Sequence, residues 1–282
     1  MATAYARRQS MEKNPLGEQT EYPQKYNPDI LYPIPRWPAR SLLDIDKKIK
    51  MYGIDHWHAY EISWLNKDGK PEVRMAEFFF NADSENIVES KSLKLYLNSF
   101  NAEQFANEKE VEQNIVTDLS KVSQSEVKVV LQNLNVASLD ETSTRIGVSI
   151  DKESVGTIEK EPNEQLLSVT EDVAFDEELH SDLFRSNCPV TGQPDWASIH
   201  IEYTGPQIDR SNLLTYLCSF RSHQGYHEEC AERIFRDISL QCKPTELKLS
   251  LNFLRRGGID INVYRSTEVM TSDMVIPRLA RQ

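Results

Sequence analysis

Apolar and polar residues alternate in two neighbouring runs in the first half of the chain. Tyr60, Ile62 and Trp64 alternate with polar residues, a pattern typical of a strand with one buried face. The segment 67–70 (KDGK) predicts a tight turn, and the run 72–80 (EVRMAEFFF) predicts a returning strand. The pattern therefore indicates an antiparallel β-hairpin.

A helical spacing follows this hairpin. Apolar residues recur every three to four positions from Ala102 to Leu119, which predicts a helix. Val127, Val129 and Leu131 then alternate along the chain and predict another strand.

The second half repeats this plan of strands, then a helix, then strands. The hairpin is predicted around the turn 255–258 (RRGG). The apolar positions that carry the pattern are Ile199, Ile201 and Tyr203 in the strand, Cys230, Ala231, Ile234, Phe235 and Ile238 in the helix, and Leu247, Leu249, Leu251, Phe253, Ile259, Ile261 and Val263 in the hairpin. The run 96–100 (YLNSF) is also echoed at 216–220 (YLCSF), which indicates a duplication. Two such groups predict an α+β fold with antiparallel sheets.

Changes in composition divide the chain into four parts. Residues 1–40 are rich in Tyr and Pro and predict an extended arm. Two modules follow, at 41–134 and 188–282. Between them, residues 135–187 are acidic and rich in Ser, Thr and Glu, and they predict a long connector with short strands.

Charge and composition narrow the class of protein. The 282 residues carry a formal net charge of −12, with 39% hydrophobic and 27% charged residues, as in soluble globular chains. So acidic a chain disfavours nucleic-acid binding, although a local basic cluster still suits a phosphorylated cofactor. We find neither an apolar run long enough to span a bilayer nor a hydrophobic signal segment, and no CxxC pair among four cysteines. We therefore expect a cytoplasmic protein that binds neither nucleic acid nor membrane.

The segment 186–196 (SNCPVTGQPDW) carries the candidate nucleophile. Prolines and a glycine fix a loop around Cys188, and Asp195 follows at the predicted entry of a strand. A thiolate with a nearby carboxyl group can attack an electrophile and protonate the product. The alternative is a buried cysteine and a turn carboxylate, because a lone cysteine is a weak signal.

Three further segments offer binding groups. His227 and Glu228 open a predicted helix, where a first-turn glutamate ordinarily interacts with the helix dipole. Ser90 and Lys91 suit a phosphate, and the alternative is a solvated connection between a strand and a helix. The guanidinium and N–H groups of the turn 255–258 also suit a phosphate, and the alternative there is a plain hairpin turn. Neither GxGxxG nor GxxxxGK[ST] is present, so any nucleotide site must be of another kind.

A zinc site is a further alternative. Cys188, His227 and Cys230 are possible ligands, yet no CxxC or HExxH pair supports them. We therefore predict no metal.

Several motifs together resemble the NADPH-dependent 7-cyano-7-deazaguanine reductases, the nitrile reductases of queuosine biosynthesis. The run 89–100 (ESKSLKLYLNSF) is similar to the signature motif of that family, and 186–196 is similar to its nucleophile loop. Further matches, in order along nearly the whole chain, are LGEQTEY at 16–22, PIPR at 33–36, SFRSHQGYHE at 219–228 and RRGGIDIN at 255–262. The arrangement is that of the long, two-module form.

The resemblance implies a tandem tunnelling fold (T-fold) with helices packed on one face, a homodimer, and no metal requirement for catalysis. It makes Cys188 the nucleophile and Asp195 the proton donor, while Tyr226 keeps a ring where some relatives carry Phe. The positions implied for the base are Val88, Glu89, Ser90, His227 and Glu228. The positions implied for NADPH are Ser90, Lys91, Arg256 and Gly257.

The implied reaction reduces the nitrile of 7-cyano-7-deazaguanine to the primary amine of 7-aminomethyl-7-deazaguanine. Cys188 forms a covalent thioimide, two NADPH are consumed, and His227 assists proton movement. Glu228 and Glu89 accept hydrogen bonds from the base. Two rival classes remain open: a zinc-dependent T-fold hydrolase of the GTP cyclohydrolase type, and a non-catalytic tandem module that binds a purine-like ligand.

Overall fold

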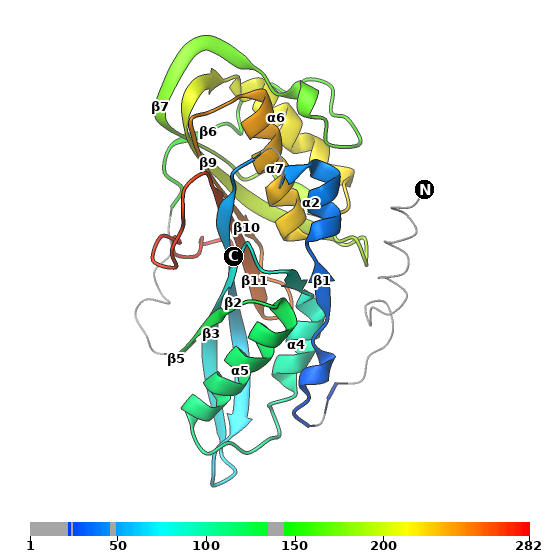
Figure 1. Ribbon diagram of the computed structural model, residues 1–282, viewed down its shortest axis with the longest axis vertical. Coiled ribbons are helices and arrows are strands. Elements are labelled where there is room, and N and C mark those ends of the chain that lie inside the picture. Colours follow the sequence, from blue (N-terminus) through cyan, green and yellow to red (C-terminus); the bar gives the residue numbers. More distant parts are fainter. Residues whose placement is uncertain (1–21, 24, 46–48, 135–143) are drawn as a thin grey trace.

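The structure, a computed structural model, describes residues 22–23, 25–45, 49–134 and 144–282. One nine-stranded sheet runs through the whole molecule (Figure 1). Its strands are β2 (Tyr52–Leu65), β3 (Pro71–Asn81), β5 (Val127–Gln132), β6 (Val148–Ser149), β7 (Val169–Ser181), β8 (Arg185–Asn187), β9 (Pro194–Ile208), β10 (Glu246–Phe253) and β11 (Ile259–Ser266).

The strands follow the order β5-β3-β2-β11-β10-β9-β7-β6, and β8 pairs with β9 off this path. Every pairing is antiparallel except that of β6 with β7. The predicted α+β class with antiparallel sheets is therefore confirmed. The pairing of β2 with β11 joins the two halves of the chain into one sheet.

The main helices form two groups along the sheet (Figure 1). In the first half of the chain, α4 (Ser90–Asn98) contacts β2 and α5 (Glu108–Ser123) contacts β5. In the second half, α6 (Arg210–Cys218) precedes α7 (His227–Gln241), which contacts β10 and β11. The apolar stripe predicted on α7 is fully buried, and the main core lies between these helices and the sheet.

The repeated five-residue run makes the same contacts in both halves. The hydroxyl of Tyr96 donates to Asp118 at 2.6 Å, and the hydroxyl of Tyr216 donates to Asp237 at 2.6 Å. In both runs the serine hydroxyl also donates to the carbonyl oxygen of the tyrosine, at 2.5 Å. The two halves thus share local structure as well as sequence.

Two predicted elements begin at different residues in the structure. The helix predicted from Ala102 begins at Glu108, because Asn107 is extended and caps the helix by accepting from the N–H of Glu110. Strand β2 begins at Tyr52, well before the alternating run. Its first part has buried residues on both faces, so the apolar alternation that marks a half-buried strand is absent there.

The acidic connector contains a longer strand than its composition predicts. Strand β7 has 13 residues and pairs with β9, and its register shifts at two points. Asp176 in β7 has a positive φ of 47°, so the strand does not keep a simple two-residue period. Residues 135–143 lie outside the described part.

The N-terminal arm, predicted to be extended up to residue 40, contains a helix at its end. Residues 1–21 lie outside the described part, and with them nearly all of the LGEQTEY motif. After them, β1 (Pro33–Pro35) pairs with β4 (Asn86–Val88), and α2 (Trp37–Leu43) follows. A proline lies in the first turn of α2, where its missing N–H breaks no helical hydrogen bond.

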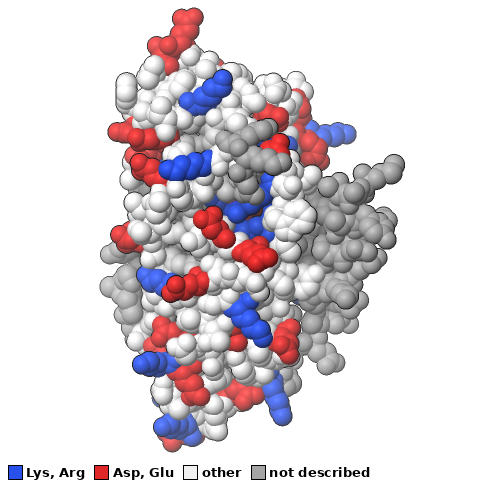
Figure 2. Space-filling model, in the orientation of Figure 1, with Lys and Arg blue, Asp and Glu red and all other residues white. Residues whose placement is uncertain are grey.

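Short 3₁₀ helices lie at η1 (Pro28–Ile30), η3 (Glu164–Leu166) and η4 (Ser219–Ser222). Among the described residues, we find no helix with the length and apolarity needed to cross a bilayer. On the face drawn in Figure 2, acidic and basic side chains intermingle.

Candidate functional site

Cys188 lies in a tight loop between β8 and β9. Its N–H donates to the carbonyl oxygen of Gln193 at 2.9 Å, and its own carbonyl accepts from Gly192 at 3.0 Å. Gly192 has a φ of +70°, a conformation that other residues rarely adopt. The thiol is therefore half-buried on a loop held by its own backbone.

This loop is tied to the segment that leads into α7. Asn187, next to Cys188, donates its N–H to His223 at 2.9 Å and accepts from Gly225 at 3.2 Å. Tyr226 follows, and the pKa of its phenol is raised by burial and then by Glu229, Glu89 and Cys188. The candidate nucleophile, the start of α7 and the start of α4 thus meet around Tyr226.

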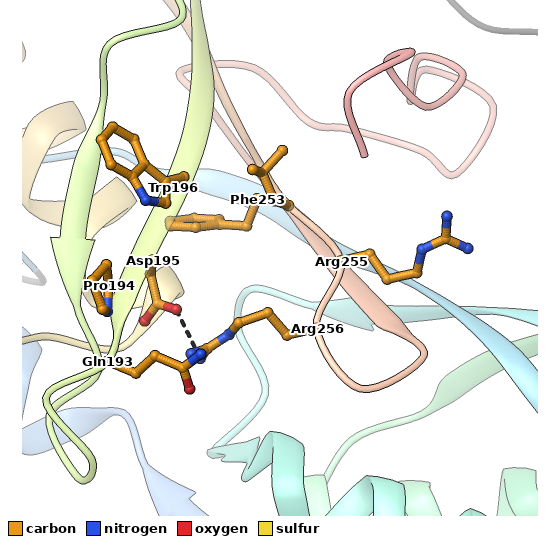
Figure 3. A pocket seen from close by; sticks show the side chains of 8 residues that line it. Gln193, Pro194, Asp195, Trp196, Phe253, Arg255 and Arg256 are labelled. Atoms are coloured by element: carbon orange, nitrogen blue, oxygen red, sulfur yellow. Dashed lines mark ion pairs between the residues drawn. The ribbon is translucent and has the colours of Figure 1, made fainter.

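Asp195 and Arg256 form an ion pair in a pocket of about 350 Å³ (Figure 3). Oδ1 of Asp195 lies 2.7 Å from Nη2 of Arg256, on the hairpin turn after β10. Burial raises the pKa of Asp195 to about 6, although the charge of Arg256 opposes this rise. An acid with this pKa is partly protonated near neutral pH, so it is able to donate a proton.

Arg256 acts on a second candidate residue. Burial, and then the positive charge of Arg256, lower the pKa of His227 to about 3, so its imidazole is neutral at neutral pH. The ring packs edge-on against Phe253, with centroids 3.9 Å apart. Neutral imidazole can accept one proton and donate another, as proton movement requires.

Glu228 is buried and only partly satisfied. Its side chain is 2% exposed, and Oε1 has no hydrogen-bond partner among the described residues. Burial, and then Asp55, raise its pKa to about 8, while Arg36 and Arg265 oppose the rise. A buried acceptor without a partner is costly, so this position is suited to a ligand that donates a hydrogen bond.

Glu89 caps α4 and lies beside Val88, the buried last residue of β4. Its carboxylate accepts from the N–H groups of Lys91 at 2.9 Å and Ser92 at 2.7 Å. Burial raises its pKa, and these two N–H groups oppose the rise. Glu89 thus has a structural role, whatever else it binds, and Ser90 is the first residue of the helix that it caps.

The hairpin that carries Arg256 lies against α4. Gly257 has a φ of +60°, and a Cβ there would lie 2.9 Å from Nζ of Lys94. The structure therefore brings the turn close to the helix that carries Ser90 and Lys91. Sequence reasoning missed Lys94, although its i, i+3 spacing from Lys91 on one helix was a usable signal.

The pocket also includes residues that the motifs did not single out. Trp196 and Phe253 line it beside Asp195, and Arg255 turns away from the ion pair (Figure 3). The guanidinium of Arg255 instead lies 4.0 Å from the ring centroid of Tyr60. The neighbouring arginines of the turn therefore have different surroundings.

The alternative zinc ligands do not form a compact set. In the described ranges, one grouping of three His, Cys, Asp or Glu side chains has ligand atoms close enough for a metal ion. It does not contain Cys188, His227 or Cys230.

Comparisons with known proteins match most of the chain. The family model described as "Nitrile reductase, 7-cyano-7-deazaguanine-reductase N-term" matches residues 22–131, and the model "QueF-like protein" matches residues 194–271. Proteins of Burkholderia ambifaria and Burkholderia multivorans, each called "NADPH-dependent 7-cyano-7-deazaguanine reductase", are 46% identical over 256 residues. These alignments cover 90% of this chain and 93% of each relative.

A solved structure of the archaeosine synthase QueF-Like in the apo form aligns with 33% of this chain and 92% of that chain. The sequence identity is 20% and the TM-score 0.29.

A half-buried cysteine on a short loop, with a buried acid at the start of the strand that follows, is an arrangement found in enzymes that use a cysteine nucleophile. Within that class, the chain belongs to the family of NADPH-dependent 7-cyano-7-deazaguanine reductases.

Proposed function

We propose that this protein reduces the nitrile of 7-cyano-7-deazaguanine to the primary amine of 7-aminomethyl-7-deazaguanine, with NADPH as reductant. The main support is the site in which Cys188 and Tyr226 adjoin the start of α7 and Asp195 is buried. Membership of the nitrile reductase family gives this chemistry its substrate class.

In the first step, the Cys188 thiolate attacks the nitrile carbon and the nitrogen takes a proton from Asp195. The carbon–sulfur bond forms as one π bond of the nitrile is lost, which gives a thioimide. An acid with a pKa of about 6 suits this role, because it is partly protonated at neutral pH and a moderately strong donor. His227, neutral at this pH, has the proposed role of moving protons in the later steps.

The residues proposed for NADPH fit a phosphorylated ligand. Arg256 and Gly257 lie on the turn that contacts Lys94 of α4, and Ser90 and Lys91 begin that helix. Three positive side chains and a turn with exposed backbone suit phosphate groups. When bound, NADPH supplies hydride, and two equivalents are needed for the four-electron reduction of a nitrile to an amine.

Glu228 is the proposed anchor for the base. A deazaguanine presents a ring N–H and an exocyclic amine on one edge, and a carboxylate accepts from both. The unpartnered Oε1 of Glu228 supports this assignment, and Glu89, which follows Val88, lies near enough to Tyr226 at the start of α7 to raise the pKa of that phenol. Binding such a donor edge also favours the ionised form of Glu228.

We further propose a homodimer that acts in queuosine biosynthesis, the pathway of a modified tRNA base. Light scattering coupled to size-exclusion chromatography checks the oligomeric state, with twice the chain mass of 32.5 kDa expected.

The deciding experiment follows loss of NADPH absorbance with 7-cyano-7-deazaguanine as substrate. Wild type should consume two NADPH per nitrile, and Cys188→Ala should consume none. Cys242→Ala is the matched control, because this cysteine is buried at the end of α7, outside the proposed site. No NADPH consumption by freshly reduced wild type would contradict the proposal.

A further inference from the structure

A cluster of buried polar side chains occupies the face of the sheet opposite the helices. In β2, Trp57 and Ala59 belong to the main core, so His56 and His58 project from the other face. His58 lies between two carboxylates, with Glu77 of β3 on one side and Asp260 of β11 on the other. None of these residues belongs to the site of nitrile reduction proposed above.

Three of these side chains are arranged as metal ligands are. His56, His58 and Glu77 each offer one donor atom, and these atoms lie within 4.8 Å of one another. His56 is 2% exposed and His58 8% exposed, so the donors are shielded from bulk water. Two imidazoles and a carboxylate are a donor set that Zn²⁺ accepts in four-coordinate sites, with water as the fourth ligand.

The hydrogen bonds around His58 orient its ring as in a metal ligand. Its Nδ1 lies 2.7 Å from Oδ1 of Asp260. A carboxylate only accepts, so Nδ1 of His58 donates to Asp260, and Nε2 is the nitrogen that remains for a metal ion. Asp260 is itself held by the hydroxyl of Tyr60 at 2.5 Å and the amide of Asn262 at 2.8 Å. A carboxylate that orients a histidine in this way is the usual outer partner of a metal ligand.

His56 is also oriented, and one of its nitrogens is unused. Its ring stacks on Phe79, with centroids 4.4 Å apart and planes 7° apart. Nε2 lies 2.7 Å from Oε2 of Glu77, whose other oxygen accepts from Gln132. Nδ1 is buried and has no hydrogen-bond partner among the described residues. The hydrogen bonds within the protein thus leave part of the ring's binding capacity unused.

The chemistry of the cluster favours a cation as well. Glu77 and Asp260 each place a carboxylate oxygen 2.7 Å from a histidine nitrogen, and carboxylate oxygens attract a divalent ion.

We propose that His56, His58 and Glu77 bind one Zn²⁺ per chain, with Asp260 as the outer partner that orients His58. The ion links β2 directly to β3, and through Asp260 to β11, so it stabilises the junction between the two halves of the sheet. It takes the place of the hydrogen bond between Nε2 of His56 and Glu77, and the ring proton of His56 moves to the unpartnered Nδ1.

The test measures metal content and affinity in the full chain without an affinity tag. After treatment with a chelator, the protein is titrated with Zn²⁺ by calorimetry, and bound zinc is counted by mass spectrometry after dialysis. Wild type should bind one zinc. His58→Asn and Glu77→Gln should lose it, and Asp260→Asn should bind about 10–100-fold more weakly.

A second histidine–glutamate pair on the same sheet supplies the matched control. His200 lies 3.1 Å from Glu178, yet it has no further ligand within reach among the described residues. His200→Asn should therefore retain stoichiometric zinc. The proposal fails if wild type binds no zinc, or if His200→Asn and His58→Asn lose it equally.

Cobalt replacement separates this site from the thiol without any variant. Co²⁺ bound by imidazole and carboxylate gives visible d–d bands only, whereas a thiolate ligand adds intense near-ultraviolet charge transfer. We expect d–d bands alone. A charge-transfer band that is present in wild type and absent in Cys188→Ala would instead show that the metal binds the thiol of Cys188. Since neither readout depends on NADPH or nitrile, failure here leaves the proposed reductase untouched.

Discussion

At the scale of single residues, Arg256 sets the protonation of Asp195. Its guanidinium stabilises the carboxylate, so the pKa of about 6 reflects burial partly offset by this charge. In Arg256→Met that pKa should rise by about one unit, since a close opposite charge lowers a carboxyl pKa by at least that much. The formation of the thioimide should then persist to higher pH, because the proton donor stays protonated.

Mass spectrometry of the Cys188 adduct, formed without NADPH over a range of pH, measures the pH above which thioimide formation falls. Arg255→Met is the matched control, because Arg255 turns away from Asp195 and lies over Tyr60 (Figure 3). If thioimide formation fell at the same pH in the two variants, Arg256 would not control the pKa of Asp195.

Glu228 illustrates a conflict between binding and stability. Its pKa is about 8 in the folded chain and near 4.5 when exposed, so the folded state holds the proton more tightly. Stability attributable to Glu228 is therefore lost as pH rises from 4.5 through 8. Glu228→Gln should raise the melting temperature at pH 8, by about 2–4 °C per kcal/mol recovered, with no gain near pH 4.5.

The same substitution should weaken binding of the base by about 10–100-fold, because a charge-assisted hydrogen bond becomes a neutral one. Calorimetry in a Cys188→Ala background measures this affinity without covalent capture. Unchanged affinity would remove Glu228 from the base site.

The candidate site could be proposed from the sequence where its residues lie in short runs. Cys188 with Asp195, and His227 with Glu228, are each close in sequence, so motifs proposed them, and their roles stay predictions. The contact of Gly257 with Lys94 was not predictable, because it depends on where a hairpin of the second half lies against a helix of the first. Likewise, no local pattern reveals that Arg256 lies beside Asp195.

At the scale of elements, two carboxylates occupy the same position in the two halves. Glu89 caps α4, and Asp209 caps α6 by accepting from Asn212 at 2.8 Å. Glu89→Ala and Asp209→Ala should each lower the free energy of unfolding by about 1 kcal/mol, the usual loss for an N-cap. Only Glu89→Ala should also reduce affinity for the base, which calorimetry in the Cys188→Ala background measures. If both variants kept full affinity, Glu89 would be a helix cap alone.

Elements with one buried face were predictable, whereas elements with other burial patterns were not. The helix α7 and the β10–β11 hairpin have regular apolar periods, and both form as predicted. In β7 most side chains are exposed and the register shifts twice, so no period marks the strand. The first part of β2 contains Asp55, His56 and His58, which are buried with polar partners that lie far away in sequence.

At the scale of the whole molecule, a buried ionic network connects the two halves behind the proposed base site. Arg265 of β11 lies 2.7 Å from Asp55 of β2 and 2.7 Å from Glu232 of α7. Arg40 of α2 pairs with Glu232 at 2.8 Å, and Arg36 pairs with Asp55. Despite burial, Arg265 and Arg40 hold the pKa of Glu232 at about 2, so its charge persists at any ordinary pH.

Removal of one partner from such a network leaves a buried charge uncompensated. Arg265→Met should therefore lower the free energy of unfolding by about 3–5 kcal/mol, whereas Arg210→Met, which breaks the more exposed pair with Glu177, should cost less than about 1 kcal/mol. Urea unfolding at fixed protein concentration compares the two variants. Similar midpoints would mean that Arg265 is replaceable, and that packing of the sheet alone holds the two halves together. A large difference would instead mean that the charge network fixes how β2, β11 and α7 meet, and with it the position of Glu228 at the start of α7.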